Sequence, residues 1–247
     1  MNEGTLIVVH CWAGDRPAIE QLLPLWTHHG QYVLLLSPED APLKFDPPGT
    51  VSGGANTAGV FCRSAGGNGW MGTHVPHRLL AHWKIALEYQ GDVNLVSSPA
   101  VMTRVAQWFF VNEWDSFCMT PELPAECYED EDTFWSLEVD ESWAVGPVTS
   151  GLRASFPYFM SRKVLKQLIT TGEELIEGIT DGPDLPLYGN MSPDGFTMHL
   201  IKEAGIKHKP YLDGKDNRDA LDGPVPRIIH WHGLTDYNLP LLAAGYL

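Results

Sequence analysis

The stretch TLIVVHCWAGDRPAIEQLLPLWTHHGQYVLLLS, residues 5–37, decides the fold class. It begins and ends with short apolar runs, TLIVVH and YVLLLS, which are typical of buried strands. Between them Asp15-Arg-Pro predicts a helix start, and apolar residues then recur at helical spacing up to Gly30. Two buried strands joined by a helix predict a parallel sheet covered by helices, and therefore an α/β fold.

The middle of the chain continues this alternation. Residues 77–89, HRLLAHWKIALEY, predict a helix with its leucines and Trp83 on one stripe. Residues 108–115, WFFVNEWD, predict a strand that ends on two acids. Elsewhere we expect a long Gly- and Pro-rich loop at 41–73, a strand at 92–98 and a short helix at 99–107.

The C-terminal part predicts three more elements. PYFMSRKVLKQLITT, residues 157–171, is a strand or turn followed by a helix. SPDGFTMHLIKEAG is a second helix, with Ser192 as its N-cap and proline at its first position. RIIHWHG, residues 227–233, is a late strand whose alternation places His230 and His232 on one face.

Composition bounds the class of protein. The 247 residues, 44% hydrophobic and 19% charged, suit one large globular domain or two small ones. No apolar run reaches the length of a membrane span, and the N-terminal strand does not resemble a signal peptide, so we expect a cytoplasmic protein. The four cysteines show no CxxC spacing and are expected to be free thiols.

The net charge of −15 is spread unevenly, with no Lys or Arg between Arg104 and Arg153. Such a field disfavours nonspecific binding of nucleic acid. Basic residues are denser after Arg153, where they form either a local basic face or an ordinary mixed surface. The acidic segment 121–142 contains Trp135 and Leu137, so we expect it to cover part of the core.

Glu113 and Asp115 are the sharpest chemical signal. Ligands of α/β sheets bind beyond the carboxyl ends of strands, where both acids lie, and their spacing projects them to one side of an extended strand. One interpretation is that they hold Mg²⁺ or Mn²⁺ together with diphosphate oxygens. The other is an acidic strand end that simply faces solvent.

Two further features of the sequence suggest other kinds of site, a hydrolase triad and a phosphate-binding loop. The N-terminal stretch and RIIHWHGLTD match the start and a late strand of an α/β-hydrolase, with Asp236 as its acid. However, Cys62-Arg-Ser64-Ala-Gly66 lacks the first glycine of a nucleophile elbow, and no histidine follows Asp236. The glycine-rich runs at 52–56 and 64–72 lack phosphate-loop spacing, and they predict a loop that closes over a substrate.

The order of the elements resembles that of GT-A-type nucleotide-sugar glycosyltransferases, particularly small phage and bacterial members. The resemblance rests on VVHCWAGD, LLLSPED, RLLAHWKIALEY, FFVNEWDSF, PYFMSRKVLKQLI, SPDGFTMHLIKEAG and IHWHG, and it covers about residues 5–235. It implies a Rossmann-like GT-A sandwich with a mostly parallel central sheet flanked by helices. It also implies a single domain, with a nucleotide-sugar-binding half at 1–120 and an acceptor-binding half at 121–247.

The resemblance implies roles for residues at the reacting centre. Glu113 and Asp115 would hold the metal diphosphate, with His230 or His232 assisting. Asp194 matches the position of the usual catalytic base. The alternatives are a first-turn carboxylate that interacts with the helix dipole, and histidines that only pack in a strand.

A second group of residues would bind the nucleotide. The resemblance places the base at the end of the first strand, at His10 and Trp12, where the indole either stacks on the base or packs in the core. Glu39 and Asp40 either accept hydrogen bonds from the nucleoside or form a plain turn. Arg63 is a further candidate contact.

The expected protein is a metal-dependent hexosyl- or pentosyltransferase. It would move a sugar from a nucleotide diphosphate, with UDP the first choice, to a hydroxyl acceptor. The phage-like resemblance suggests 5-hydroxymethylpyrimidine in DNA, and a host-cytoplasm location if phage-encoded, whereas the charge favours a glycan or small molecule. An esterase of the α/β-hydrolase type and a noncatalytic nucleotide-binding protein are the alternatives from other classes.

Overall fold

The fold is taken from a computed structural model. It describes residues 5–17, 19–20, 23, 32–43, 60–66, 74–88, 90–91, 104–112, 116–118, 125–136, 139–140, 153–154, 157–179, 193–210 and 230–232.

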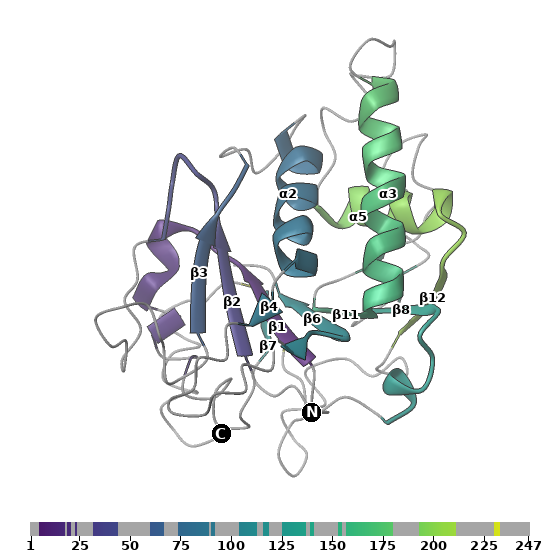
Figure 1. Ribbon diagram of the computed structural model, residues 1–247, viewed down its shortest axis with the longest axis horizontal. Coiled ribbons are helices and arrows are strands. Elements are labelled where there is room, and N and C mark those ends of the chain that lie inside the picture. Colours follow the sequence, from purple (N-terminus) through teal and green to yellow (C-terminus); the bar gives the residue numbers. More distant parts are fainter. Residues whose placement is uncertain are drawn as a thin grey trace.

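A seven-stranded mixed sheet forms the centre of the protein (Figure 1). Its order is β12-β8-β11-β6-β1-β2-β3, and every neighbouring pair is parallel except the two that involve β11. The predicted mostly parallel sheet is therefore confirmed. The strands are β1 (Thr5–His10), β2 (Tyr32–Ser37), β3 (Val60–Ser64), β6 (Trp108–Asn112), β8 (Thr133–Ser136), β11 (Tyr158–Ser161) and β12 (Lys207–Pro210).

Short elements accompany this sheet. Three two-stranded antiparallel sheets pair β10 with β9, β13 with β7, and β4 with β5. Two 3₁₀ turns, η1 (Ala13–Asp15) and η2 (Ala125–Tyr128), follow β1 and precede β8. The short strands are β4 (Gln90–Gly91), β5 (Arg104–Val105), β7 (Ser116–Cys118), β9 (Val139–Asp140), β10 (Arg153–Ala154) and β13 (His230–His232).

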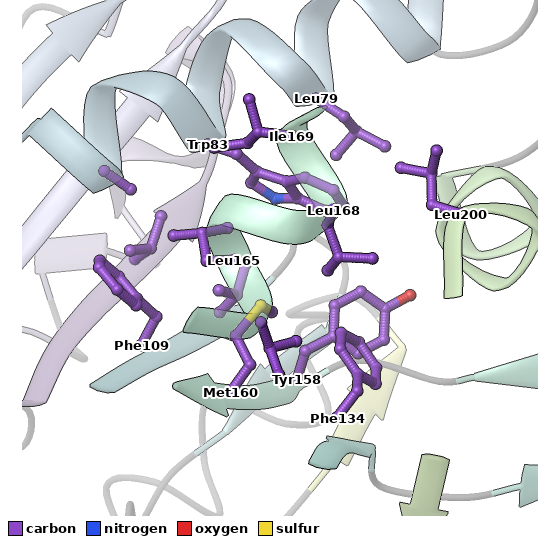
Figure 2. Packing of buried hydrophobic residues seen from close by; sticks show 14 of the residues in the cluster. Leu79, Trp83, Phe109, Phe134, Tyr158, Met160, Leu165, Leu168, Ile169 and Leu200 are labelled. Carbon is purple, nitrogen blue, oxygen red and sulfur yellow. The ribbon is translucent and has the colours of Figure 1, made fainter. Parts of the chain in front are cut away.

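Three helices cover one face of the sheet (Figure 1): α2 (His74–Glu88), α3 (Arg162–Ile179) and α5 (Pro193–Glu203). Alternate strand residues face them, because successive side chains of a strand point to opposite sides. Figure 2 shows the result, in which Trp83 of α2 and Leu165 and Leu168 of α3 pack above Phe109 and Met160 of the sheet. This helix-covered face holds the larger part of the described core.

The opposite face carries an aromatic cluster. Trp108 and Phe159 stack with their ring centroids 5.3 Å apart, and Tyr128 of η2 packs edge-on against both rings. Phe110, Trp135 and the fully buried Cys127 complete the cluster. The acidic segment around residue 130 therefore does more than cover the core, since it supplies strand β8.

Polar side chains and one glycine set the ends of two helices. The Ser161 hydroxyl accepts a hydrogen bond from the Val164 amide at 3.1 Å, which caps the start of α3. After α5 the chain turns at Gly205, whose φ is 63°, and the Ile206 amide donates back to the Ile201 carbonyl. A left-handed residue of this kind is the usual helix stop, and glycine adopts it without steric cost.

Two sequence predictions are wrong. The composition of residues 60–64 predicts part of a long loop, but they form β3, because Val60 to Ser64 pair with β2 in the main sheet. Arg104 and Val105 form β5 in place of the predicted short helix. The expected strand at 92–98, Ser192 and most of the closing loop lie outside the described residues. Cys11, Cys62 and Cys127 are free thiols, as expected.

Candidate functional site

The parallel strands end together at one edge of the sheet, which we call the carboxyl edge. It comprises the last residues of the parallel strands and the first residue of β11: His10, Ser37, Ser64, Asn112, Ser136, Pro210 and Tyr158. From β1 the chain moves outward to β2 and β3, and then returns to β6 on the other side of β1. Ligands of open α/β sheets bind at such a reversal of strand order. The crevice beyond β1 and β6 is therefore the expected site.

The metal candidates follow β6 directly. Asn112 is the register partner of Val9, so the chain enters residues 113–115 beside the end of β1. Glu113 and Asp115 themselves lie outside the described residues. The backbone of β7 resumes at Ser116, and Ser116 pairs with His232 of β13. The fold thus pairs His232 with Ser116, the residue that follows Asp115, although the two lie more than a hundred residues apart in the sequence.

His230 is placed less closely. Its register partner is Cys118, two residues further along β7 than Ser116. No cluster of three His, Cys, Asp or Glu side chains that could hold a metal is found among the residues the structure describes, a set that excludes both acids and the side chains of β13.

At the end of β1, His10 forms a hydrogen bond with a residue that the sequence did not single out. His10 Nδ1 lies 2.7 Å from Nδ1 of His82 on α2, and the two rings stack at 4.9 Å. His82 Nε2 lies 2.9 Å from the Ala65 carbonyl oxygen. Since a carbonyl only accepts, His82 donates through Nε2, and its Nδ1 accepts from His10. The pair therefore joins the ends of β1 and β3 through α2.

Both histidines are held in the neutral form. Burial, and then the nearby positive charge of Arg78, lowers the pKa of His82 to about 4. Burial, and then electrostatic repulsion from His82 and Arg78, which disfavours protonation, lowers the pKa of His10 well below its usual value. Neutral imidazoles are what the hydrogen-bond chain needs, because a protonated His82 could not accept from His10.

Arg78 is the second residue that the sequence did not single out. It is only 3% exposed, and its guanidinium carbon lies 4.8 Å from the centroid of the Trp12 ring. Arg78 and His82 are four residues apart and so share one face of α2. That spacing was readable from the sequence, but the strand ends that this face meets were not.

The other predicted nucleotide contacts are exposed at the ends of β2 and β3. Glu39 and Asp40 form a turn after β2, and the Glu39 amide donates to the Gly66 carbonyl at 3.0 Å. Arg63 is exposed on β3 and donates to the Cys62 carbonyl. Ser64 is bonded to Ser37 at 3.1 Å. These residues lie at the same sheet edge as Trp12 but beside β2 and β3.

Asp194 reaches the carboxyl edge through Tyr158. The Tyr158 hydroxyl donates to Asp194 Oδ1 at 2.6 Å. Tyr158 is buried in the helix-covered core, and Figure 2 shows its hydroxyl directed toward α5. Its register partner is Val111, next to the last residue of β6. Asp194 is thus tied to the strand that leads into the two acids.

Three basic residues of the C-terminal part are paired with acids. Asp130 and Asp132 of the acidic segment form ion pairs with Lys163, Lys207 and Lys209. Lys163 lies just after β11, whose last residue, Ser161, pairs with Trp108 at the start of β6. Lys163 is therefore at the edge of the sheet opposite the carboxyl edge. These lysines are therefore matched by acids, and Lys163 lies away from the carboxyl edge.

The protein has an α/β fold, a mostly parallel seven-stranded sheet with helices packed on it, and its strand order reverses at β1. Comparison with known proteins does not assign the chain to a family. No family model matches the sequence, and no curated protein matches it. The crystal structure of the nucleoside-diphosphate-sugar pyrophosphorylase from Vibrio cholerae RC9 is similar with a TM-score of 0.48 and 12% identity, over 97% of this chain and 99% of that one. Across the described residues, every helix is too short or too polar to span a bilayer.

Proposed function

We propose that the protein is a nucleotide-sugar glycosyltransferase with its site at the carboxyl edge between β1 and β6. One observation supports this most: the pairing of β7 with β13, in which His232 is the register partner of Ser116, the residue that follows Asp115 in the sequence. Trp12, which follows β1, the neighbour of β6 in the sheet, would bind the nucleoside. Donor and acceptor sites would belong to one domain, with the donor bound mainly by residues 1–120.

The donor atoms fit a divalent cation. Two carboxylates and one imidazole suit Mn²⁺, and the carboxylates alone suit Mg²⁺. In this proposal Glu113 and Asp115 hold the ion and His232 assists. When bound, the ion would neutralise the charge that develops on the leaving diphosphate. The protein's own part is to orient that diphosphate beside the nucleoside at Trp12.

Asp194 is proposed as the general base. Its Oδ1 accepts the hydrogen bond from Tyr158, which fixes the orientation of the carboxylate. Oδ2 would then take the proton of the acceptor hydroxyl as that oxygen attacks the anomeric carbon. The bond from this carbon to the diphosphate oxygen breaks, and the nucleoside diphosphate leaves. One carboxylate in this position corresponds to direct displacement with inversion.

A glycan or small-molecule hydroxyl is the acceptor we favour. The described lysines at Lys163, Lys207 and Lys209 are paired with acids, so they do not offer the basic approach that DNA would need. Transfer to 5-hydroxymethylpyrimidine would also require the base to leave the stack. Hydroxymethylated DNA therefore belongs in the acceptor panel as the competing substrate.

The test is turnover of UDP- and GDP-sugars, with and without Mn²⁺, by wild type and Asp115→Ala. We expect release of nucleoside diphosphate that depends on Mn²⁺ and falls at least roughly 100-fold in the variant. Turnover that survives both chelation and Asp115→Ala would overturn the metal assignment. Esterase activity lost in Ser64→Ala would indicate the hydrolase instead, and nucleotide binding without turnover would indicate a noncatalytic protein.

A further inference from the structure

Helix α2 is attached to the carboxyl edge at three points. His82 is bonded to His10 of β1 and to the Ala65 carbonyl after β3. The third point is Gly66, where a side-chain carbon in place of the glycine hydrogen would lie 2.9 Å from the Arg78 Cα atom. Real Cβ atoms essentially never approach so closely, so only glycine permits this contact. These contacts fix where the Arg78 side chain begins.

The Arg78 guanidinium then lies over the indole of Trp12, 4.8 Å from its centroid. The arginine is buried, whereas Trp12 is partly exposed. One face of the indole is therefore occupied from the protein side, and the ring is held in a fixed plane at the end of β1. Arginine suits this role because its planar guanidinium stacks on aromatic rings as well as carrying charge.

We propose that Arg78 is a positioning residue for the nucleobase, and that the Trp12–Arg78 stack is the platform on which the base of a nucleoside diphosphate binds. This inference rests on the proposed nucleotide site. A ring held in place before binding loses less conformational freedom when the base stacks on it. Arg78 acts through Trp12 and not on the phosphates, because it is buried behind the ring.

The test separates base from phosphate recognition. Isothermal titration in Mn²⁺ measures the affinities of UDP, GDP and inorganic pyrophosphate for wild type, Arg78→Lys, Trp12→Leu and the double variant. Arg78→Lys keeps the charge but loses the planar stack. We expect this substitution to weaken the affinity for UDP or GDP roughly 3- to 30-fold and to leave the affinity for pyrophosphate unchanged. The double variant should bind no more weakly than Trp12→Leu, because Arg78 acts through that ring.

Gly66→Ala provides a second variant, which keeps both the Arg78 and the Trp12 side chains but displaces α2, and with it Arg78, from its place over the indole. It should weaken the binding of UDP or GDP and leave the binding of pyrophosphate unchanged. It therefore replaces Arg78→Lys if circular dichroism shows that the Arg78→Lys protein is unfolded. Equal losses for nucleotide and pyrophosphate, additive effects in the double variant, or no effect in folded variants would each overturn the role of Arg78. Wild-type protein that binds neither UDP nor GDP would instead overturn the proposed function itself.

Discussion

The Tyr158 hydroxyl donates a hydrogen bond of 2.6 Å to Asp194, joining the first residue of β11 to the first turn of α5. The two residues are 36 positions apart in the sequence. Their contact ties the carboxylate to β11, whose first residue pairs with Val111 near the end of β6. The bond gives Asp194 a fixed orientation that a helix-capping carboxylate does not need.

Removing the Tyr158 hydroxyl should therefore reduce both activity and stability. We expect Tyr158→Phe to lower kcat about 10-fold or more, because a misplaced base is a poor one. The free energy of unfolding should fall by about 1–3 kcal/mol, since a buried hydrogen bond to a carboxylate is lost. Steady-state kinetics and urea titration measure the two effects.

Asp194→Asn should lower kcat by roughly 10²–10⁴-fold while donor binding is retained. Tyr128→Phe is the matched control for Tyr158→Phe. Tyr128 lies on the opposite face of the sheet, so its substitution should leave kcat unchanged. If Asp194→Asn were fully active, Asp194 would be only a first-turn carboxylate of α5.

The two late histidines should differ in their effect on metal binding. His232 pairs with Ser116, adjacent to Asp115, whereas His230 pairs with Cys118 further away. We expect His232→Ala to raise the Mn²⁺ concentration needed for half-maximal activity by about 10- to 100-fold. His230→Ala should leave it within about 2-fold, since its register partner Cys118 is two residues further along β7 than Ser116. The reverse ranking would contradict the assignment of His232.

Stability should fall on acidification because of His82. Its pKa is lowered from 6.5 to about 4, mainly by burial. Well above its ordinary pKa of 6.5 the histidine is neutral in both folded and unfolded chains and contributes no pH dependence. Below that pH the unfolded chain takes up a proton that the folded protein does not, so stability decreases progressively down to about pH 4. The loss from this residue alone should reach about 3 kcal/mol.

Urea titrations from neutral pH down to about pH 4.5 test this expectation. His82→Gln should flatten the pH dependence of the unfolding free energy. His208, whose pKa burial also lowers to about 4, provides an independent comparison on β12. His208→Gln should flatten the slope separately, and the two effects should add because His82 lies on α2 and His208 on β12, the strand at the far edge of the sheet. An unchanged slope in His82→Gln would show that the His10–His82 bond does not require neutral rings.

The contact between α2 and α3 gives a packing prediction. A side-chain carbon at Gly172 of α3 would lie 2.6 Å from Leu80 Cδ2. Gly172→Ala gains helix propensity worth about 1 kcal/mol but forces the Leu80 side chain to move within a packed core. We expect a net loss of about 1 kcal/mol in the free energy of unfolding. In a Leu80→Val background the same substitution should become neutral or stabilising, which thermal and urea denaturation can measure.

Much of the architecture was predictable from local pattern. The strands at 5–10 and 32–37 and the helix around Trp83 are where the sequence placed them, because apolar runs and stripes report burial directly. β3 was missed because its surroundings are rich in glycine and proline, and because an edge strand needs its partner β2 to be recognised. The sequence also predicted a strand at 108–115, and β6 occupies Trp108–Asn112 of that range.

The composition of the candidate site was only partly predictable. Trp12, His10 and Asp194 could be selected because the resemblance places its contacts at the end of the first strand and at the start of this helix, and both elements are predictable from local sequence. Arg78 and His82 carried no such mark, and the long-range pairs His10–His82 and Tyr158–Asp194 join residues tens of positions apart. The side chains that surround a site are fixed by which elements pack together.

The sequence by itself determined the α/β class, the order of its main elements and the residue types that end its strands, because these depend on local hydrophobic period and turn chemistry. Only the tertiary structure decided that β1 and β6 are neighbours, that His232 lies across from Ser116, and that Arg78 backs Trp12. The physical reason is that strand order and helix docking are set by the packing of the whole core, which no single segment encodes.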